Sequence, residues 1–253
     1  MIFFLLYAIG VGYAGLATEE RSKLTLKNLG NLVRYGALTA LIGGMTVPAM
    51  ADLVTNGNFS GQNPSPQGYL TFTSGQTFAG AWTVGDGAQS ASGTGSVDWI
   101  GSYWLPPTGA APLDGSVDLD GTSAGAISQT ITTVPNGKYV LTFFLSGNPD
   151  NTSAPIKSLL VNAGTTGGSY TYDTTGNGHT SMNYIPESLM FTATSSSTVI
   201  SFVSNDAAGS DWGPVVGGIS VNPAATTPEP GFYGALAIGL CGLFYLVRRR
   251  QSA

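Results

Sequence analysis

The middle of the chain lacks the periodicity of a helix, and this limits the fold more than any other feature. Between residues 52 and 226, no stretch of 10–15 residues repeats its apolar side chains at helical spacing. Short runs rich in β-branched and aromatic residues alternate instead with clusters of turn-forming residues. This pattern predicts an all-β domain, an antiparallel β-sandwich of the jelly-roll kind. We expect strands over residues 81–84, 96–100, 116–119, 126–134, 138–146, 158–161, 169–172, 189–193, 198–203 and 218–221.

Two of these runs give the clearest local signal. Residues 126–134 and 138–146 are joined by Pro135-Asn136-Gly137. Proline suits the first central position of a turn and glycine its exit. The second run carries apolar side chains at alternate positions from Tyr139 to Leu145, as a strand with one buried face requires. We therefore predict that the two runs pair as a β-hairpin.

Charge is distributed unevenly along the 253 residues. Residues 52–226 contain two lysines, no arginine and eleven carboxylates, a formal charge of −9. Such a surface repels the phosphates of nucleic acids and anionic lipid headgroups, so we exclude a nucleic-acid partner. The single cysteine, Cys241, excludes a disulfide within the chain, and we interpret it as a small apolar packing residue.

The C-terminal tail, residues 227–253, has three parts in a fixed order. The triplet Pro228-Glu229-Pro230 comes first, an uncharged apolar run over residues 231–247 follows, and Arg248, Arg249 and Arg250 close it. As a helix, the run would span roughly 25 Å, close to the thickness of a bilayer core. Arginines resist translocation and stay on the cytoplasmic side, so the preceding chain is expected outside the inner membrane.

This order of parts resembles the PEP-CTERM sorting signal of Gram-negative bacteria. The resemblance implies that an exosortase, a membrane transpeptidase, cuts near the triplet and hands the protein to the cell surface or its polysaccharide. The proline residues agree with this, because they keep the triplet extended and outside the helix. The alternative is a plain membrane anchor that is never cut.

The N-terminal segment, residues 1–51, reads as a secretion signal. Lys27 and Arg34 flank an apolar stretch over residues 35–47, and Ala49-Met50-Ala51 is a small-residue cleavage site. We predict cleavage after Ala51, which leaves an exported domain of residues 52–226. The alternatives for the apolar residues 1–16 are a translation start assigned too early and a genuine first transmembrane helix.

A second resemblance covers nearly the whole exported domain. It rests on short motifs spread along the chain: Asn56-Gly57-Asn58-Phe59, Trp82-Thr83-Val84, residues 95–101, Tyr103-Trp104, residues 115–121, 125–130 and 139–144, Ser146-Gly147-Asn148 and Gly213-Pro214. The pattern resembles the choice-of-anchor C family of bacterial surface proteins and a plant cell-wall domain family of unknown function. Both are similar to galactose-binding-like sandwiches, the fold of many carbohydrate-binding modules. Gly217 stands where the family pattern has an aspartate.

A cluster of aromatic residues is the candidate binding site. Trp99, Tyr103 and Trp104 lie close together between glycines and prolines. Aromatic rings in a loop can stack on the apolar face of a sugar, while carboxylates or amides bond its hydroxyl rim. We therefore predict a carbohydrate site that uses these rings with Asp98, and with Asp114 and Asn148 as further partners. The alternative is that at least two of the rings fill the core, as we expect for Trp82 and Trp212.

Two aspartates form a weaker, metal-type pattern. Alternation along a strand would place Asp118 and Asp120 on one face, and carboxylate oxygens suit a structural Ca²⁺. Galactose-binding-like folds often carry such an ion, but the sequence has no complete calcium-binding loop. The alternative is a solvated strand face that ends in a turn at Gly121.

Enzymatic motifs are weak in this chain. His179 is the only histidine and Glu187 the only glutamate of the exported domain, so neither a zinc site nor a Ser-His triad is indicated. We predict a non-enzymatic surface or matrix protein whose sandwich contacts extracellular polysaccharide. The alternatives are a polysaccharide-acting hydrolase or lyase and a purely structural matrix protein.

Overall fold

The computed structural model describes residues 52–61, 68–107, 115–224, 239–242 and 248. The predicted signal segment with Ala49 and Ala51, the triplet at 228–230, most of the apolar tail and Arg249 and Arg250 lie outside the described residues. Residues 239–242 are helical. Within the described ranges, no helix is both long and apolar enough to cross a membrane.

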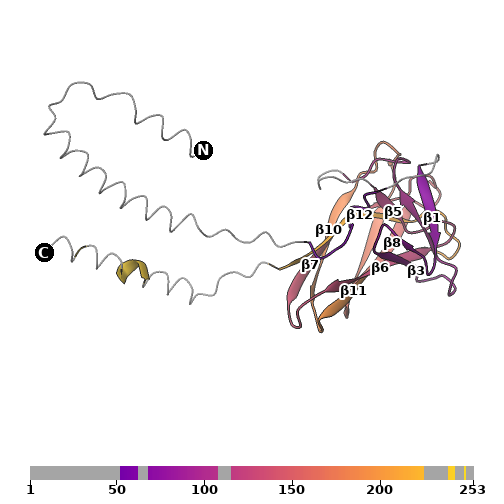
Figure 1. The fold of residues 1–253 in the computed structure, drawn as a ribbon. Helices are drawn as coiled ribbons and strands as arrows, with labels where there is room; N and C mark the ends of the chain where they lie inside the picture. Colours follow the sequence, from indigo (N-terminus) through magenta and orange to yellow (C-terminus); the bar gives the residue numbers. More distant parts are fainter. Residues whose placement is uncertain (1–51, 62–67, 108–114, 225–238, 243–247, 249–253) are drawn as a thin grey trace, which may run out of the picture. The chain divides into compact units, whose positions relative to one another are not determined.

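The domain of residues 52–224 is built from twelve strands in the described residues (Figure 1). One six-stranded sheet, sheet A, has the order β1-β4-β5-β12-β7-β10 and the other, sheet B, has the order β2-β3-β6-β11-β8-β9. The strands of sheet A are β1 (Tyr69–Thr73), β4 (Ser96–Ile100), β5 (Ser116–Asp118), β7 (Lys138–Gly147), β10 (Ile185–Thr192) and β12 (Pro214–Pro223). Those of sheet B are β2 (Thr77–Phe78), β3 (Trp82–Asp86), β6 (Gly125–Thr132), β8 (Ile156–Ala163), β9 (Thr166–Asp173) and β11 (Ser197–Ser204).

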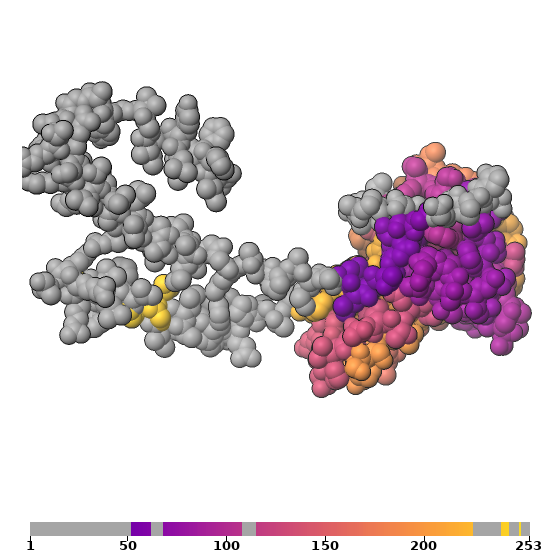
Figure 2. All heavy atoms as spheres, viewed as in Figure 1, coloured from indigo at the N-terminus to yellow at the C-terminus, as the bar shows by residue number. Residues whose placement is uncertain are grey.

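Every strand pair is antiparallel, which confirms the predicted all-β, two-sheet arrangement. The ten predicted runs overlap β3 to β12 in order. The two strands that the sequence reading missed are β1 and β2. In the space-filling view, the first strands, in purple, pack against later strands, in pink and orange, as one body (Figure 2).

Alternating apolar side chains from both sheets form one core. Tyr139, Leu141 and Phe143 of β7 face inward from sheet A and are buried, as predicted. Phe202 of β11 faces inward from sheet B, and its ring meets that of Phe143 edge-on, with the ring centroids 5.1 Å apart. Burying each such aromatic side chain contributes about 1.5–3 kcal/mol, and this contact joins the two layers.

The predicted hairpin of residues 126–134 and 138–146 is wrong, although its turn is present. The N–H of Gly137 donates to the carbonyl of Val134 across Pro135 and Asn136, and Asn136 has φ of 64°, as a type II turn requires. The strands on either side do not pair, because β6 pairs with β3 and β11 whereas β7 pairs with β10 and β12. The turn therefore carries the chain from one sheet to the other.

The start of the domain is joined to its last strand. The N–H of Leu53 donates to the carbonyl of Val221, and a bulge in β12 lets the N–H of Ile219 donate to the carbonyl of Gly57. A β-carbon on Gly57 would lie 1.8 Å from the carbonyl oxygen of Ile219, so only glycine allows this approach. Both ends of the domain therefore leave from the same end of the sandwich.

The other end of the sandwich is formed by loops. Strand β7 runs from Lys138, whose carbonyl accepts from Ala224, to Gly147, which pairs with Pro214. The loops after β7 and before β12 therefore lie at the end away from the domain termini, which we call the distal end. At ~3.3 Å per residue, the ten residues of β7 separate the two ends by ~33 Å.

Candidate functional site

A hollow of about 310 Å³ opens at the distal end. We call it the distal hollow. Its lining residues come partly from sheet A and partly from loops. The strands contribute Tyr69, Asp98 and Ile100, and the loops contribute Tyr103, Trp104, Gly121, Thr122, Asn148, Asp150, Asp211 and Trp212. Four loops from distant parts of the sequence thus converge, and the volume lies in the range of small-ligand sites.

Asp98 brings a carboxylate into the hollow from strand β4. The hydroxyl of Thr71 on the neighbouring strand donates to it. Burial raises the pKa of Asp98, the bond from Thr71 lowers it, and repulsion by the Asp211 carboxylate raises it further. Asp211 therefore lies close enough to destabilise the charged form of Asp98.

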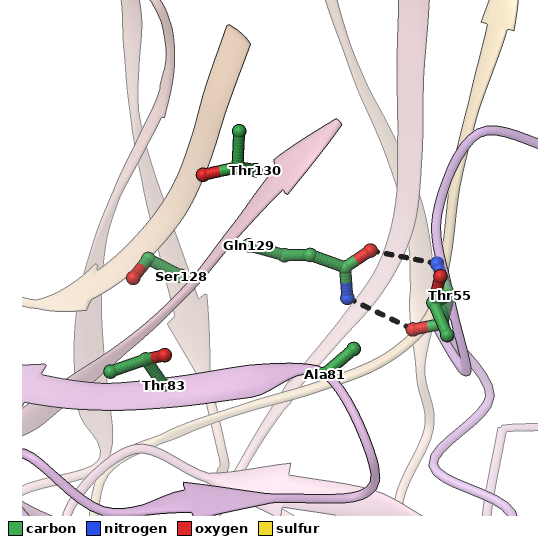
Figure 3. Close-up of a pocket in the computed structure, with 6 residues that line it drawn as sticks. All are labelled: Thr55, Ala81, Thr83, Ser128, Gln129 and Thr130. Carbon is green, nitrogen blue, oxygen red and sulfur yellow. Dashed lines mark hydrogen bonds between the residues drawn. The ribbon is translucent and has the colours of Figure 1, made fainter. Parts of the chain in front are cut away.

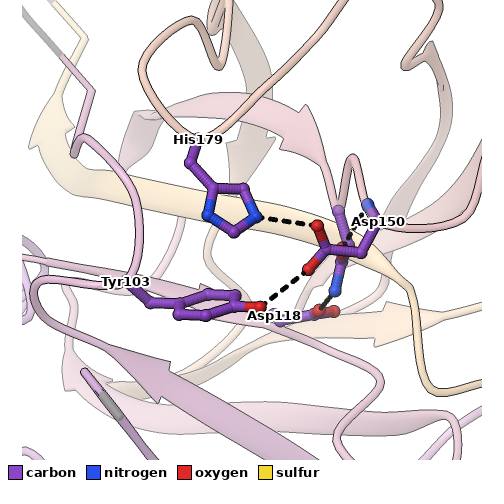
Figure 4. Close-up of polar contacts among 5 residues, drawn as sticks. Tyr103, Asp118, Asp150 and His179 are labelled. Atoms are coloured by element: carbon purple, nitrogen blue, oxygen red, sulfur yellow. Dashed lines mark hydrogen bonds and ion pairs between the residues drawn. The ribbon is translucent and has the colours of Figure 1, made fainter. Parts of the chain in front are cut away.

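Asp150, in the loop after β7, contacts residues of two other loops, Tyr103 and His179. Its carboxylate lies 2.7 Å from Nε2 of His179 and accepts a 3.1 Å hydrogen bond from the hydroxyl of Tyr103 (Figure 4). The ring of His179 also packs on that of Tyr103, with the centroids 4.5 Å apart. Burial, and next the negative charge of Asp150, raise the pKa of Tyr103, so its hydroxyl stays protonated and keeps donating. This arrangement fixes the Tyr103 ring at the edge of the hollow.

Trp212 presents the most accessible aromatic surface of the distal hollow, with 37% of the residue exposed. Its backbone is held at the peptide group that follows it. The buried ammonium of Lys157 donates to the Trp212 carbonyl at 2.7 Å, and the N–H of the next residue, Gly213, donates to the carboxylate of Asp118 at 3.0 Å. Fixing this peptide group lowers the entropy cost of placing the indole ring for binding.

The two aspartates predicted as a calcium pair are both fully buried, so the alternative of a solvated strand face is wrong. Strand β5 ends at Asp118, and Asp120 follows in an isolated bridge. The Asp118 carboxylate accepts from the N–H groups of Asp120 and Gly213 and from the side-chain amide of Asn148. Both of its oxygens are therefore already hydrogen-bonded within the protein.

Asp120 is different, because neither of its carboxylate oxygens has a hydrogen bond of ordinary geometry among the described residues. Burial raises its pKa to about 7, although nearby Ser204 and Ser210 hydroxyls and the Lys157 ammonium lower it. Calcium takes six to eight oxygen ligands, whereas the described residues contain no group of three or more acidic, His or Cys side chains placed to hold a metal. With a lysine beside it, this carboxylate does not fit a calcium site.

The structure brings together three of the four predicted sugar-binding residues and excludes the fourth. Asp98, Tyr103 and Trp104 line the distal hollow. Trp99 follows Asp98 in β4 and therefore faces the opposite side of the sheet, where its indole N–H donates to the carbonyl of Phe59. Its prediction as a sugar-binding residue is corrected: the ring packs against the main core.

The alternative that rings fill a core is partly right. Trp104 is only 4% exposed, belongs to a small second core outside sheet A and bonds Ser116 at 3.0 Å. Trp82 is fully buried as predicted, whereas Trp212, also predicted as a core residue, is exposed.

Gly217, which stands where the choice-of-anchor C pattern has an aspartate, has a steric role. A β-carbon on Gly217 would lie 2.9 Å from Cγ of Pro107. The loop that carries Tyr103 and Trp104 therefore packs directly on β12 at this glycine, and an aspartate would push it away. Asp114, predicted as a further partner, lies outside the described residues.

Sequence reasoning missed Asp150, Asp211, Trp212 and the pairing of His179. Each lies in a loop of ordinary composition, and only the topology brings it to the hollow. The one available signal was the Gly213-Pro214 pair, which predicts a turn next to Trp212.

A second hollow, of about 320 Å³, lies at the edge of sheet B (Figure 3). Its lining consists of small and hydroxyl side chains and of Gln129, whose amide forms two hydrogen bonds with the backbone of Thr55, at 2.7 and 2.9 Å. It contains neither an aromatic ring nor a charged group. Gln129 therefore attaches the start of the domain, and the distal hollow remains the better binding site.

The described part of residues 52–224 is thus an antiparallel two-sheet sandwich with an acidic, aromatic-lined hollow at the end away from the domain termini. The chain belongs to the family described as "Protein of unknown function (DUF642)", whose model matches residues 52–222. The family model does not test the choice-of-anchor C and PEP-CTERM resemblances, which stay predictions.

Several known proteins are similar to parts of the chain. Halomucin of Haloquadratum walsbyi is 35% identical over 121 residues, which are 44% of this chain and 1% of halomucin. A family 35 carbohydrate binding module from Clostridium thermocellum shares 15% identity, with a TM-score of 0.36 over 61% of this chain and 99% of that one. TmCBM61, solved with β-1,4-galactotriose, shares 12% identity, with a TM-score of 0.33 over 69% of this chain and 99% of that one. At these scores, neither structure indicates a ligand for this chain.

Proposed function

We propose that the exported domain is a non-enzymatic module that binds extracellular polysaccharide in the distal hollow. The observation that carries this is the presence of a partly exposed Trp212 ring, on a hydrogen-bonded backbone, beside the carboxylates of Asp98, Asp150 and Asp211 in one hollow. An aromatic face matches the apolar side of a sugar ring, and carboxylates accept from its hydroxyls. A galactose-binding-like assignment of the sandwich is part of the same proposal.

Glycan-array binding by residues 52–226 tests the proposal. These residues carry their own core and join their two ends through the backbone, so we expect them to fold alone. The wild-type domain should bind a set of polysaccharides that Trp212→Ala no longer binds. The control is Met190→Ala on β10, since this apolar side chain is also exposed but does not line the hollow. Equal binding by the wild type and Trp212→Ala would remove the site.

An enzymatic role is the weaker alternative. A lyase needs a base, and Tyr103 is poorly suited because burial and Asp150 raise its pKa. We therefore expect no new reducing ends and no unsaturated products when the domain is incubated with the polysaccharides it binds. Release of either product, lost in Tyr103→Phe, would establish an enzyme instead.

We further propose that the protein is exported and then processed by an exosortase at Pro228-Glu229-Pro230. The tail pattern supports this, and so does the geometry of the domain: both ends leave opposite the distal hollow, so a membrane-held precursor would present its binding site outward. Mass spectrometry of the protein from cell fractions tests it. We expect a mature form that begins at Asp52 and lacks residues 231–253. A full-length cytosolic protein would contradict the proposal.

A further inference from the structure

The ionisable residues that line the distal hollow are acidic, and the one basic side chain of the described residues that contacts them is His179, which pairs with Asp150. The three ionisable carboxylates of the hollow belong to Asp98, Asp150 and Asp211, and no lysine or arginine is among its described lining residues. The domain has only two lysines and no arginine. Lys138 lies at the opposite end of β7, and Lys157 is buried with its ammonium on a backbone carbonyl. Neither lysine of the domain is therefore in reach of Asp98 and Asp211, and His179 contacts only the third acid, Asp150.

The carboxylates also repel one another. Asp211 disfavours the charged form of Asp98. Behind them, burial raises the pKa of Asp118, and the negative charges of Asp120 and Asp98 raise it further. A positive group placed between Asp98 and Asp211 would relieve this repulsion and form charge-assisted hydrogen bonds. Negatively charged chains such as polyuronates would meet the opposite effect and be repelled.

The aromatic lining favours an organic cation over a metal ion. Trp212 and the Tyr69–Tyr103 pair, whose ring centroids lie 5.2 Å apart, border the same hollow as the acids. A ring face attracts an ammonium group and also stacks on the C–H face of a sugar. The acids are not grouped for a metal within the described residues, as shown above. One ligand that satisfies rings and carboxylates together is a sugar that carries an amine.

We infer that the distal hollow binds a polysaccharide with free amino groups, a polymer of 2-amino-2-deoxyhexose that is at least partly de-N-acetylated. The inference rests on the proposed function and names its ligand class. The protonated amine lies between Asp98 and Asp211, and the sugar ring packs on Trp212. An N-acetylated or hydroxyl-only chain keeps the stacking but loses the ionic contacts.

Isothermal titration calorimetry of residues 52–226 at about pH 6, where amino sugars are protonated, tests the inference. The probes are hexamers of glucosamine, N-acetylglucosamine, glucose and galacturonate, together with hexalysine. We expect the glucosamine hexamer to bind at least about tenfold more tightly than any other probe, and this preference to shrink as salt is raised.

Variants locate the effect. Asp211→Asn removes an exposed acid, so folding is safe, and should weaken binding of the glucosamine hexamer about fivefold while changing the N-acetylated hexamer less than about twofold. Asp98→Asn should act in the same way. Glu187→Gln on β10 is the matched control, because it removes one negative charge away from the hollow and should change neither affinity.

The outcomes are distinguishable. If neutral hexamers bind as tightly as the glucosamine hexamer, the amino-sugar inference fails and the proposed function stands. If hexalysine binds as tightly, the ligand is a basic protein segment and the inference also fails. If no oligosaccharide binds, the proposed function fails with it.

Discussion

The buried carboxylate of Asp120 should make the stability of the domain depend on pH. Its pKa is about 7 in the folded protein, against 3.8 for an ordinary aspartate. The folded state therefore holds this proton more tightly than the unfolded state. Between about pH 4 and pH 7 the folded state binds more protons, so the free energy of unfolding that this group contributes falls as pH rises. Above about pH 7 the loss is complete.

The substitution Asp120→Asn removes the charge and keeps the shape. The difference between the two pKa values corresponds to at most about 4 kcal/mol. At pH 8 we expect the variant to be more stable than the wild type by up to this amount, or about 8–16 °C in Tm, because the amide need not ionise in a buried site. At pH 4 the two proteins should be nearly equal.

Urea unfolding of residues 52–226, followed by tryptophan fluorescence from pH 4.5 to 8.5, measures this difference. The control is Asp173→Asn, since this exposed acid has its pKa lowered by bonds from Thr175 and should give no gain at pH 8. Taking the variant-minus-wild-type difference cancels the opposite contributions of such exposed acids. The reasoning is refuted if that difference is the same at pH 4.5 and at pH 8.

Three further predictions concern the scaffold. Gly57→Ala should lower the free energy of unfolding by more than about 2 kcal/mol, because its β-carbon would overlap the β12 backbone; Tm by calorimetry checks it. Gln129→Ala should cost about 1–3 kcal/mol in urea unfolding by breaking two hydrogen bonds to the start of the domain, and faster proteolysis there would accompany it. Phe143→Ala should cost about 3–5 kcal/mol through a core cavity, whereas Met190→Ala, 66% exposed, should stay within about 0.5 kcal/mol; equal effects would contradict the assigned core.

Most strands could be predicted because alternation is a local signal. Along β7, Tyr139, Leu141, Phe143 and Leu145 are buried, and the positions between them are exposed or half-buried. The same kind of signal is present for β1, where Tyr69-Leu70-Thr71-Phe72-Thr73 alternates over five residues, but it is short and its apolar positions are only partly buried. Strand β2 has only two residues and is too short to give a periodic pattern.

Strand partners could not be predicted in the same way. Both β6 and β7 bury one apolar face, and alternation shows that a face is buried without showing which sheet it belongs to. The turn at Pro135 is equally compatible with a hairpin and with a crossing between sheets. Which sheet each strand joins is determined by pairing between residues far apart in the sequence, such as Thr132 and Ser197, which are 65 positions apart.

The residues of the candidate site likewise fall into those that are neighbours in sequence and those that strand pairing brings together. Asp98, Tyr103 and Trp104 are neighbours in sequence and could be grouped from it, and alternation along β4 would already have placed Trp99 on the other face. Asp211 and Trp212 reach the hollow only because β12 lies next to β5 and β7. Long-range strand pairing therefore places the exposed ring, Trp212, and one of the two paired acids, Asp211, in the hollow.

Amide chemical-shift mapping of the isotope-labelled domain during titration with a bound glycan tests the central claim most directly. We predict that the largest shifts lie in residues 98–104, 121–122, 148–150 and 211–213, the segments that line the distal hollow. Shifts confined to the second hollow, around Gln129 and Thr130, or spread evenly over the outer faces of both sheets, would contradict the account.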